Sequence, residues 1–307
     1  MFCFSVVFAQ NRYLLLCASP SGAPNRILMQ KQLSLALAAS PLIIGPQGGI
    51  AGEAANMQSK QRIMRVITDC EDCPLRVNEY FRKFTQPELD FVREFKVGEF
   101  HAEPGTGIIG ERSNSPHLYT VLEGWAFRYK TLADGSRQIL NFALPGDFIG
   151  LQTSMFGEMD HSVDALSHIT LCVFPREKIW ELFTNHPDLA FDATWLVAQE
   201  EKVLGAHLTS VGRRSAQSRI AFVLLHLYRR CEGLGLAGSN RMKVPFNQQH
   251  LADLLGLSLV HTNKTLKRME ASKLMSWQKG TVRFLDRDTL AEIAEFDEPA
   301  SSARPFI

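Results

Sequence analysis

Apolar and polar positions alternate with a short period in the middle of the chain. Between residues 96 and 175, short runs rich in Val, Ile, Phe and Tyr are separated by turn residues. Glycines recur every 11 residues, at Gly124, Gly135 and Gly146, and Asp134-Gly135 is a strong hairpin dipeptide because both central turn positions need positive φ. This regular strand–turn spacing predicts a small antiparallel barrel or roll.

After Pro175 the pattern becomes helical. Residues 186–210 contain few helix breakers and place Leu189, Leu196 and Val203 seven residues apart, as in a coiled-coil seam. A helix buried in a domain core would show the same pattern. The segment lies between two predicted domains of different class, and this location favours a long dimerisation helix with these three residues at the interface.

The segment from residue 245 onward predicts two short helices joined by a tight turn. Asn247 can cap the first helix, Gly256 turns the chain, and Ser258 can cap a second helix that ends near Ser272. Apolar residues of both helices face inward, and the outer face of the second is polar and basic. This arrangement is typical of a DNA-binding helix-turn-helix, and two predicted strands around Lys279-Gly280 add a wing.

The candidate DNA-contacting residues lie in the first turn of the first of these helices and along the outer face of the second. They are Gln248, Gln249, Ser258, Val260, His261, Asn263, Lys264, Lys267 and Arg268.

The charge distribution supports a nucleic-acid partner. Residues 211–284 hold 13 Lys or Arg against three acidic residues, whereas the whole chain carries a formal net charge of +1, so the remainder sums to −9. A basic module attached to an acidic body is typical of a DNA-binding domain, although a solvated basic face would have the same composition.

The remaining composition restricts the class of protein. No apolar run reaches the length of a membrane span, and six cysteines in 307 residues without a clear secretion signal argue against a disulfide scaffold. We therefore expect a cytoplasmic protein with no membrane partner. Residues 1–56 lack a sustained period and favour a poorly ordered extension, with a signal peptide as the alternative.

These motifs, in this order, resemble the Crp–Fnr superfamily of bacterial transcription regulators. The resemblance covers residues 70–296 and is carried by Gly124, the run Pro145-Gly-Asp-Phe-Ile-Gly150, the run Leu171-Cys-Val-Phe-Pro175, the long helix, and the run His250-Leu-Ala-Asp-Leu-Leu-Gly-Leu-Ser258. It implies an α+β fold, a homodimer on a near-palindromic site in double-stranded DNA, and RNA polymerase as a partner.

The expected organisation combines these elements. It comprises an extension (1–60), a β-roll sensor domain of the cyclic-nucleotide-binding type (61–184), a dimerisation helix (185–210), a winged helix-turn-helix (211–290) and a C-terminal tail (291–307).

Two departures from the cyclic-nucleotide-binding members predict a different signal. Those members carry a Glu directly after the Gly-Asp-Phe-Ile-Gly run and an Arg-Ser pair some ten residues later, where the Arg binds the cyclic phosphate. Here these positions hold Leu151 and His161-Ser162. We therefore expect no cyclic AMP binding, and we expect His161 to be a surface or loop residue.

The oxygen-sensing members bind a [4Fe–4S] cluster through four cysteines. Cys70, Cys73 and Cys172 match three of these ligands, but Glu79 stands where the fourth is expected. The alternatives are that Cys172 is a small core hydrophobe and that Cys70 and Cys73 are incidental or form a reversible disulfide. An iron–sulfur cluster or a thiol-based redox response therefore stays open as an alternative signal, and no cofactor is certain.

The recognition helix of the oxygen-sensing members presents Glu, then Ser-Arg three and four residues later. The corresponding residues here are Val260, Asn263 and Lys264. Val260 can pack against a thymine methyl group, Asn263 can contact adenine or only the DNA backbone, and Lys264 can donate to guanine or phosphate.

Two other classes of protein fit the sequence poorly. A cupin-type enzyme needs a His-x-His motif, and none occurs; a nucleophile elbow and a P-loop are also missing. A non-DNA ligand-binding module would leave the basic winged helix unexplained. We therefore expect a non-enzymatic regulator.

Overall fold

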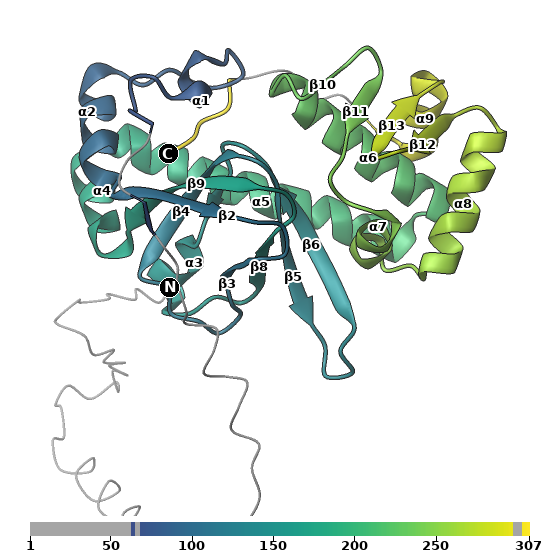
Figure 1. The fold of residues 1–307 in the computed structure, drawn as a ribbon, viewed down its shortest axis with the longest axis horizontal. Coiled ribbons are helices and arrows are strands. Elements are labelled where there is room, and N and C mark those ends of the chain that lie inside the picture. The colour runs from purple at the N-terminus through teal and green to yellow at the C-terminus, as the bar shows by residue number, and fades with distance from the viewer. Residues whose placement is uncertain (1–62, 65–67, 297–302) are drawn as a thin grey trace, which may run out of the picture. The chain divides into compact units, whose positions relative to one another are not determined.

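The computed structural model describes residues 63–64, 68–296 and 303–307 (Figure 1). The chain divides into two units, Met1–Gln58 and Ser59–Ile307, and every described residue belongs to the second. The predicted extension therefore lies outside the described residues. In the part of the chain that is described, no helix combines the length and apolarity needed to cross a bilayer.

Two antiparallel sheets form the predicted roll. One sheet has five strands in the order β1-β2-β9-β4-β7, and the other has four in the order β3-β8-β5-β6. The strands are β1 (Ile63–Met64), β2 (Gly98–Ala102), β3 (Gly107–Ile109), β4 (His117–Glu123), β5 (Ala126–Thr131), β6 (Arg137–Ala143), β7 (Phe148–Ile149), β8 (Ser162–Ala165) and β9 (Ile169–Pro175).

The predicted turn glycines occupy the positions that need them. Gly124, Gly135 and Gly146 all have positive φ, and Gly135 lies in the hairpin between β5 and β6. At Gly124 a Cβ atom would lie 2.2 Å from the carbonyl oxygen of His168, so this strand end requires glycine for space as well as for φ.

Short helices flank the roll, and a 27-residue helix follows it. Helix α2 begins with the capping box of Thr85 and Glu88. The helices of this half are α1 (Pro74–Val77), α2 (Gln86–Phe95), α3 (Leu151–Phe156), α4 (Ile179–Asn185) and α5 (Pro187–Arg213), with a 3-10 turn at Arg176–Lys178.

The C-terminal half is a winged helix-turn-helix. A four-stranded sheet in the order β10-β11-β13-β12 lies beside four helices. The elements are α6 (Ala216–Gly233), β10 (Ala237–Gly238), β11 (Arg241–Lys243), α7 (Gln248–Leu255), α8 (Leu259–Ala271), β12 (Met275–Gln278), β13 (Thr281–Phe284) and α9 (Arg287–Ala294). The predicted wing is thus the hairpin β12–β13, in which Lys279 and Gly280 both have positive φ.

Three apolar clusters hold these elements together. One fills the space between the two sheets of the roll. A second cluster packs residues 70–95 and helix α5 against the roll. A third cluster joins the winged helix-turn-helix to strands β5 and β6. The roll and the C-terminal half therefore share one continuous apolar contact.

Candidate nucleic-acid interface and ligand cavity

Helices α7 and α8 form the predicted helix-turn-helix with the predicted caps. The Asn247 side chain accepts hydrogen bonds from the backbone N–H groups of Gln249 (3.0 Å) and His250 (3.1 Å). Gly256 ends α7 with φ +62°, and the Ser258 hydroxyl accepts from the N–H of His261 at 3.2 Å. Each cap satisfies a helix-end donor that would otherwise lack a partner.

The outer face of α8 is open along its length. Leu266 and Met269 are buried beneath it, whereas the residues predicted to contact DNA on this helix are exposed: Val260, His261, Asn263, Lys264, Lys267 and Arg268. The Lys264 and Lys267 ammonium groups have no hydrogen-bond or ion-pair partner among the described residues. Positive side chains that the chain itself leaves unpaired are available to phosphate or base edges.

The candidate residues on α7 and at the N-cap of α8 are partly buried or already hydrogen-bonded within the chain. Gln248 is half-buried, the Gln249 side-chain amide donates to Asp253 at 2.6 Å, and the Ser258 hydroxyl is engaged in capping. These three residues can still donate to a phosphate, but they are poorly placed to recognise bases.

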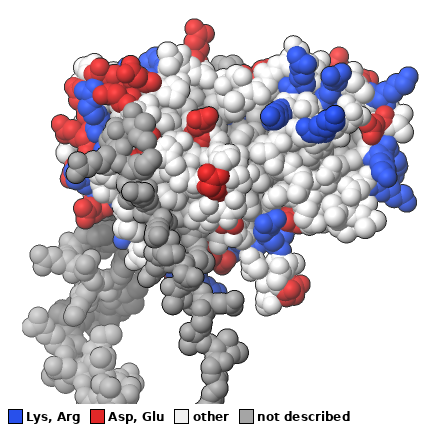
Figure 2. Space-filling model, viewed as in Figure 1, with Lys and Arg blue, Asp and Glu red and all other residues white. Residues whose placement is uncertain are grey.

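The exposed charges are segregated (Figure 2). Lys and Arg side chains gather over the C-terminal elements, and Asp and Glu gather at the side of α2. The charge asymmetry of the sequence is therefore also present on this face of the folded chain.

The roll holds α7 directly. Arg137 on β6 donates to the Asp253 carboxylate on α7 at 2.8 and 3.0 Å, and the Gln138 amide donates to the carbonyl oxygen of Leu254 at 3.1 Å. The position of the helix-turn-helix is thus linked to the β5–β6 hairpin.

Helix α5 corrects the predicted dimer seam. Leu189 is 0% exposed and Leu196 is 7% exposed within a single chain, because both pack into the apolar cluster of the roll. Val203 is half-buried and lines a cavity. Leu189 and Leu196 therefore face the core of their own chain, which was the alternative interpretation of the pattern, whereas Val203 does not belong to this cluster.

A different stripe of α5 is open to a second copy. Val197 and Leu208 are 50% and 75% exposed, and Leu204 between them is half-buried. Residues at i, i+7 and i+11 lie on one helix face.

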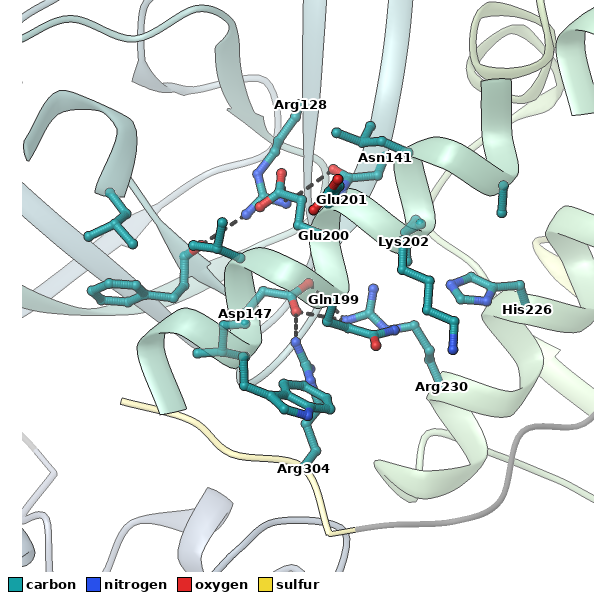
Figure 3. A pocket seen from close by; sticks show the side chains of 18 of the residues that line it. Arg128, Asn141, Asp147, Gln199, Glu200, Glu201, Lys202, His226, Arg230 and Arg304 are labelled. Atoms are coloured by element: carbon teal, nitrogen blue, oxygen red, sulfur yellow. Dashed lines mark hydrogen bonds and ion pairs between the residues drawn. The ribbon is translucent and has the colours of Figure 1, made fainter. Parts of the chain in front are cut away.

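A cavity of about 1110 Å³ lies between the roll, α5 and α6 (Figure 3). Arg128 on β5 is buried at its wall, and its guanidinium has three acceptors: the Asn141 amide oxygen (3.2 Å), the carbonyl oxygen of Phe148 (3.0 Å) and the carboxylate of Glu200 on α5 (3.0 Å). The sequence offered no signal for this ion pair, which joins residues 72 positions apart.

His161 lines this cavity; it is a loop residue directly before β8, as one of the two expectations had it, but it is buried and not at the surface. It is 5% exposed, and its Nε2 atom has no hydrogen-bond partner among the described residues. Burial, together with the nearby charge of Arg128, lowers the pKa of His161 to about 4. A neutral His at this position cannot supply the charge that a cyclic phosphate needs.

Asp147, in the Pro-Gly-Asp turn of the roll, is a buried junction. Its carboxylate pairs with Arg230 of α6 at 2.8 Å and with Arg304 near the end of the chain. Burial alone would raise the pKa of Asp147, but the guanidinium groups of Arg230, Arg304 and Arg128 outweigh it and hold the pKa well below its usual range. The carboxylate is therefore charged and ties three segments together.

The three candidate metal ligands share one apolar cluster but do not form a cluster-binding set. Cys73 and Cys172 are buried and Cys70 is half-buried. Burial raises the pKa of all three thiols, that of Cys172 to about 12. Glu79 is exposed, and the described residues contain no group of three His, Cys, Asp or Glu placed to hold a metal ion.

Comparisons with known proteins agree with this architecture. The chain matches the model of the cyclic nucleotide-binding domain over residues 99–186 and that of the Crp-like helix-turn-helix domain over residues 218–293. It is 33% identical over 220 residues to the nitrogen fixation regulation protein FixK of Bradyrhizobium diazoefficiens, covering 71% of this chain and 90% of that protein.

More distant relatives extend the match. The transcriptional activator protein FnrL of Cereibacter sphaeroides is 24% identical, over 67% of this chain and 83% of its own length. Among solved structures, FixK2 from Bradyrhizobium japonicum superimposes with a TM-score of 0.58 at 26% identity, covering 66% of this chain and 98% of that one. The sequence, the fold and the helix-turn-helix thus agree: the chain belongs to the Crp–Fnr family of DNA-binding transcription regulators.

Proposed function

We propose that this regulator binds a near-palindromic operator as a homodimer, with one α8 helix in each of two successive major grooves. The observation that carries the proposal is the outer face of α8, where Asn263, Lys264 and Lys267 are exposed. Two such helices on a two-fold axis contact half-sites about one helical turn apart. A regulator of this kind acts on the chromosome, so we infer a cytoplasmic location and RNA polymerase as a further partner.

The dimer forms, in this proposal, through the open stripe of α5. Val197, Leu204 and Leu208 supply the apolar contact, because they share one helix face on which the chain leaves Val197 and Leu208 exposed and Leu204 half-buried. The C-terminal end of α5 leads directly into α6, so pairing of the two α5 helices also sets the spacing of the two α8 helices.

The roles of the α8 side chains follow from their chemistry. Val260, which is 78% exposed, packs against a thymine methyl group, and the Asn263 amide makes a bidentate contact with adenine. Lys264 donates to guanine or to phosphate. Lys267, one turn further along, contacts phosphate and adds affinity for any sequence.

The signal is a molecule or event other than cyclic AMP. Arg128, the buried cation beside His161, already has three acceptors from the protein, and His161 is neutral. A phosphate bound at Arg128 would have to displace the Glu200 carboxylate, and breaking this pair costs free energy.

Binding-site selection on the full chain tests the DNA proposal. A pool of random duplexes should yield a two-fold-symmetric sequence, and sedimentation should show two chains per duplex. Recovery of an asymmetric site, or one chain per site, would contradict it. Addition of cyclic AMP should leave the thermal unfolding midpoint and the DNA affinity unchanged.

A second candidate signal is redox chemistry at the thiols. The observation in its favour is the grouping of Cys70, Cys73 and Cys172 in one apolar cluster of the roll. Anaerobic incubation with iron and sulfide, followed by a visible absorption spectrum, distinguishes an iron–sulfur cluster from a thiol–disulfide response. A cluster absorbs in the visible range, whereas a thiol–disulfide response leaves the spectrum blank and changes the count of free thiols.

A further inference from the structure

The last residues of the chain return from the C-terminal half to the roll. The N–H of Arg304 donates to the carbonyl oxygen of Tyr80 at 2.9 Å, and the N–H of Arg82 donates to the carbonyl oxygen of Arg304 at 2.8 Å. These two bonds form a parallel β-bridge between Phe81 and Arg304. Residues 304–307 thus pair, as a short strand would, with the segment 78–84.

Side-chain packing, in addition to these hydrogen bonds, holds residues 304–307 against the roll. Phe306 is 3% exposed, and its ring centroid lies 5.2 Å from that of Phe81 and 4.5 Å from that of Phe84. Ile307 is 2% exposed, and its backbone oxygen accepts a hydrogen bond from the Thr120 hydroxyl at 2.5 Å. Exposed tails do not bury two large apolar side chains, so this contact is part of the fold.

Arg304 links the segment to the DNA-binding half. It pairs with Asp147, whose other partner is Arg230 of α6, and Figure 3 shows both guanidinium groups converging on this one carboxylate. Arg304 is 7% exposed, and its Nη1 atom has no hydrogen-bond partner among the described residues.

The segment 78–84 also contacts the helices on which DNA binding depends. The Arg82 Nε atom donates to Asp192 of α5 at 2.8 Å. At Gly233, the last residue of α6, a Cβ atom would lie 2.4 Å from the Tyr80 ring, so ring and backbone are in close contact. A movement of this segment therefore reaches α5, α6 and residues 304–307 at once.

The same segment is adjacent to the candidate sensing thiols. Helix α1 begins directly after Cys73 and leads into residues 78–84. Cys70, Cys73, Cys172, Phe306 and Ile307 all belong to one apolar cluster. Thr120, which binds the Ile307 oxygen, stands opposite Cys172 in the pairing of β4 with β9.

We propose that residues 304–307 are an intramolecular strap that couples the Cys70–Cys73 segment of the roll to the DNA-binding half of the chain. The strap pairs with the segment that follows the two thiols on one side and shares Asp147 with α6 on the other. Coupling is reciprocal: a change at the thiols alters α6, and DNA binding alters access to the thiols. The DNA-dependent part of this proposal rests on the proposed function.

The test uses the full chain, a chain ending at Ala303 and a Phe306→Ala variant. The matched control is Phe156→Ala, because Phe156 is 80% exposed. N-ethylmaleimide labelling of Cys70 and Cys73, followed by peptide mass spectrometry, should accelerate about tenfold in both strap variants and stay unchanged in the control. Hydrogen exchange at the Arg82 amide should accelerate with it.

Coupling has two further readouts. Without DNA, exchange across α6 should rise in the strap variants; with saturating operator DNA, labelling of Cys70 and Cys73 should change in the wild type and not in Phe306→Ala. Unchanged labelling in the strap variants would overturn the proposal. Faster labelling with unchanged hydrogen exchange in α6 would mean that residues 304–307 only shield the thiols, and it would overturn the coupling. If the wild type binds no DNA, the proposed function fails while the two DNA-free readouts still decide the strap.

Discussion

The buried charges beside the cavity of the roll and the exposed charges on the outer face of α8 differ in how they are satisfied. Beside the cavity, Arg128 has three acceptors from its own chain, and Asp147 has two guanidinium partners. On α8, Lys264 and Lys267 are exposed and have no partner among the described residues. A buried charge must be paired within the protein, whereas an exposed unpaired charge is free to bind something else.

Within one chain, charges that are buried and paired stabilise the fold, whereas charges that are exposed and unpaired are available for binding. The roll keeps the fold of a cyclic nucleotide-binding domain, and its buried Arg128 is paired with an internal carboxylate, Glu200. The helix-turn-helix keeps both its fold and its unpaired outer face. Fold similarity alone would assign a ligand to both regions.

The largest expected effect distinguishes the two faces of α5. Leu196→Glu places a charge in the apolar cluster, so it should lower the free energy of unfolding by about 4 kcal/mol. Val197→Glu, one residue away on the open stripe, should leave the unfolding midpoint of the monomer nearly unchanged and abolish the dimer. Thermal unfolding and sedimentation of both variants measure this. A dimeric Val197→Glu protein would contradict the proposed interface.

The next effect concerns base recognition on α8. Asn263→Ala should weaken binding to the selected operator by about 1–3 kcal/mol and relax the preference at one position in each half-site. Repeating the binding-site selection on the variant measures the preference. An unchanged base preference would show that Asn263 contacts only the DNA backbone.

A pH effect probes the cavity. The folded pKa of His161, about 4, lies below the unfolded value near 6.5, so between these values the unfolded state binds more protons. Stability should therefore fall as the pH drops from 6.5 to 4, and His161→Gln should lose less stability over that range. The control is His168→Gln, because the His168 side chain is 80% exposed. Identical pH profiles for the wild type and His161→Gln would contradict the buried, neutral state.

The smallest effect concerns phosphate contact. Lys267→Ala should weaken binding to all sequences about equally and reduce the slope of log affinity against log salt by about 1. Fluorescence anisotropy over a salt series measures the slope. A change in base preference instead would move Lys267 from phosphate contact to base recognition.

Local signals in the sequence determined most of the secondary structure. Asn247 and Ser258 cap helices where predicted, because capping depends on a side chain and a backbone N–H only two or three residues away. Gly135 and Gly256 have the positive φ that their turns require. The polar and basic character of the outer face of α8 was equally predictable, since it depends on helix periodicity and on charge.

Tertiary contacts decided which face of α5 is buried and which charges are paired. The spacing of Leu189, Leu196 and Val203 establishes one apolar stripe, but whether that stripe meets the roll or a second copy depends on residues spread along the chain from Cys73 to Ile307. The pairing of Arg128 with Glu200, the burial of His161 and the docking of residues 304–307 on segment 78–84 are likewise long-range. Periodicity determines where a side chain points on its own element, and only the packed structure determines what it meets there.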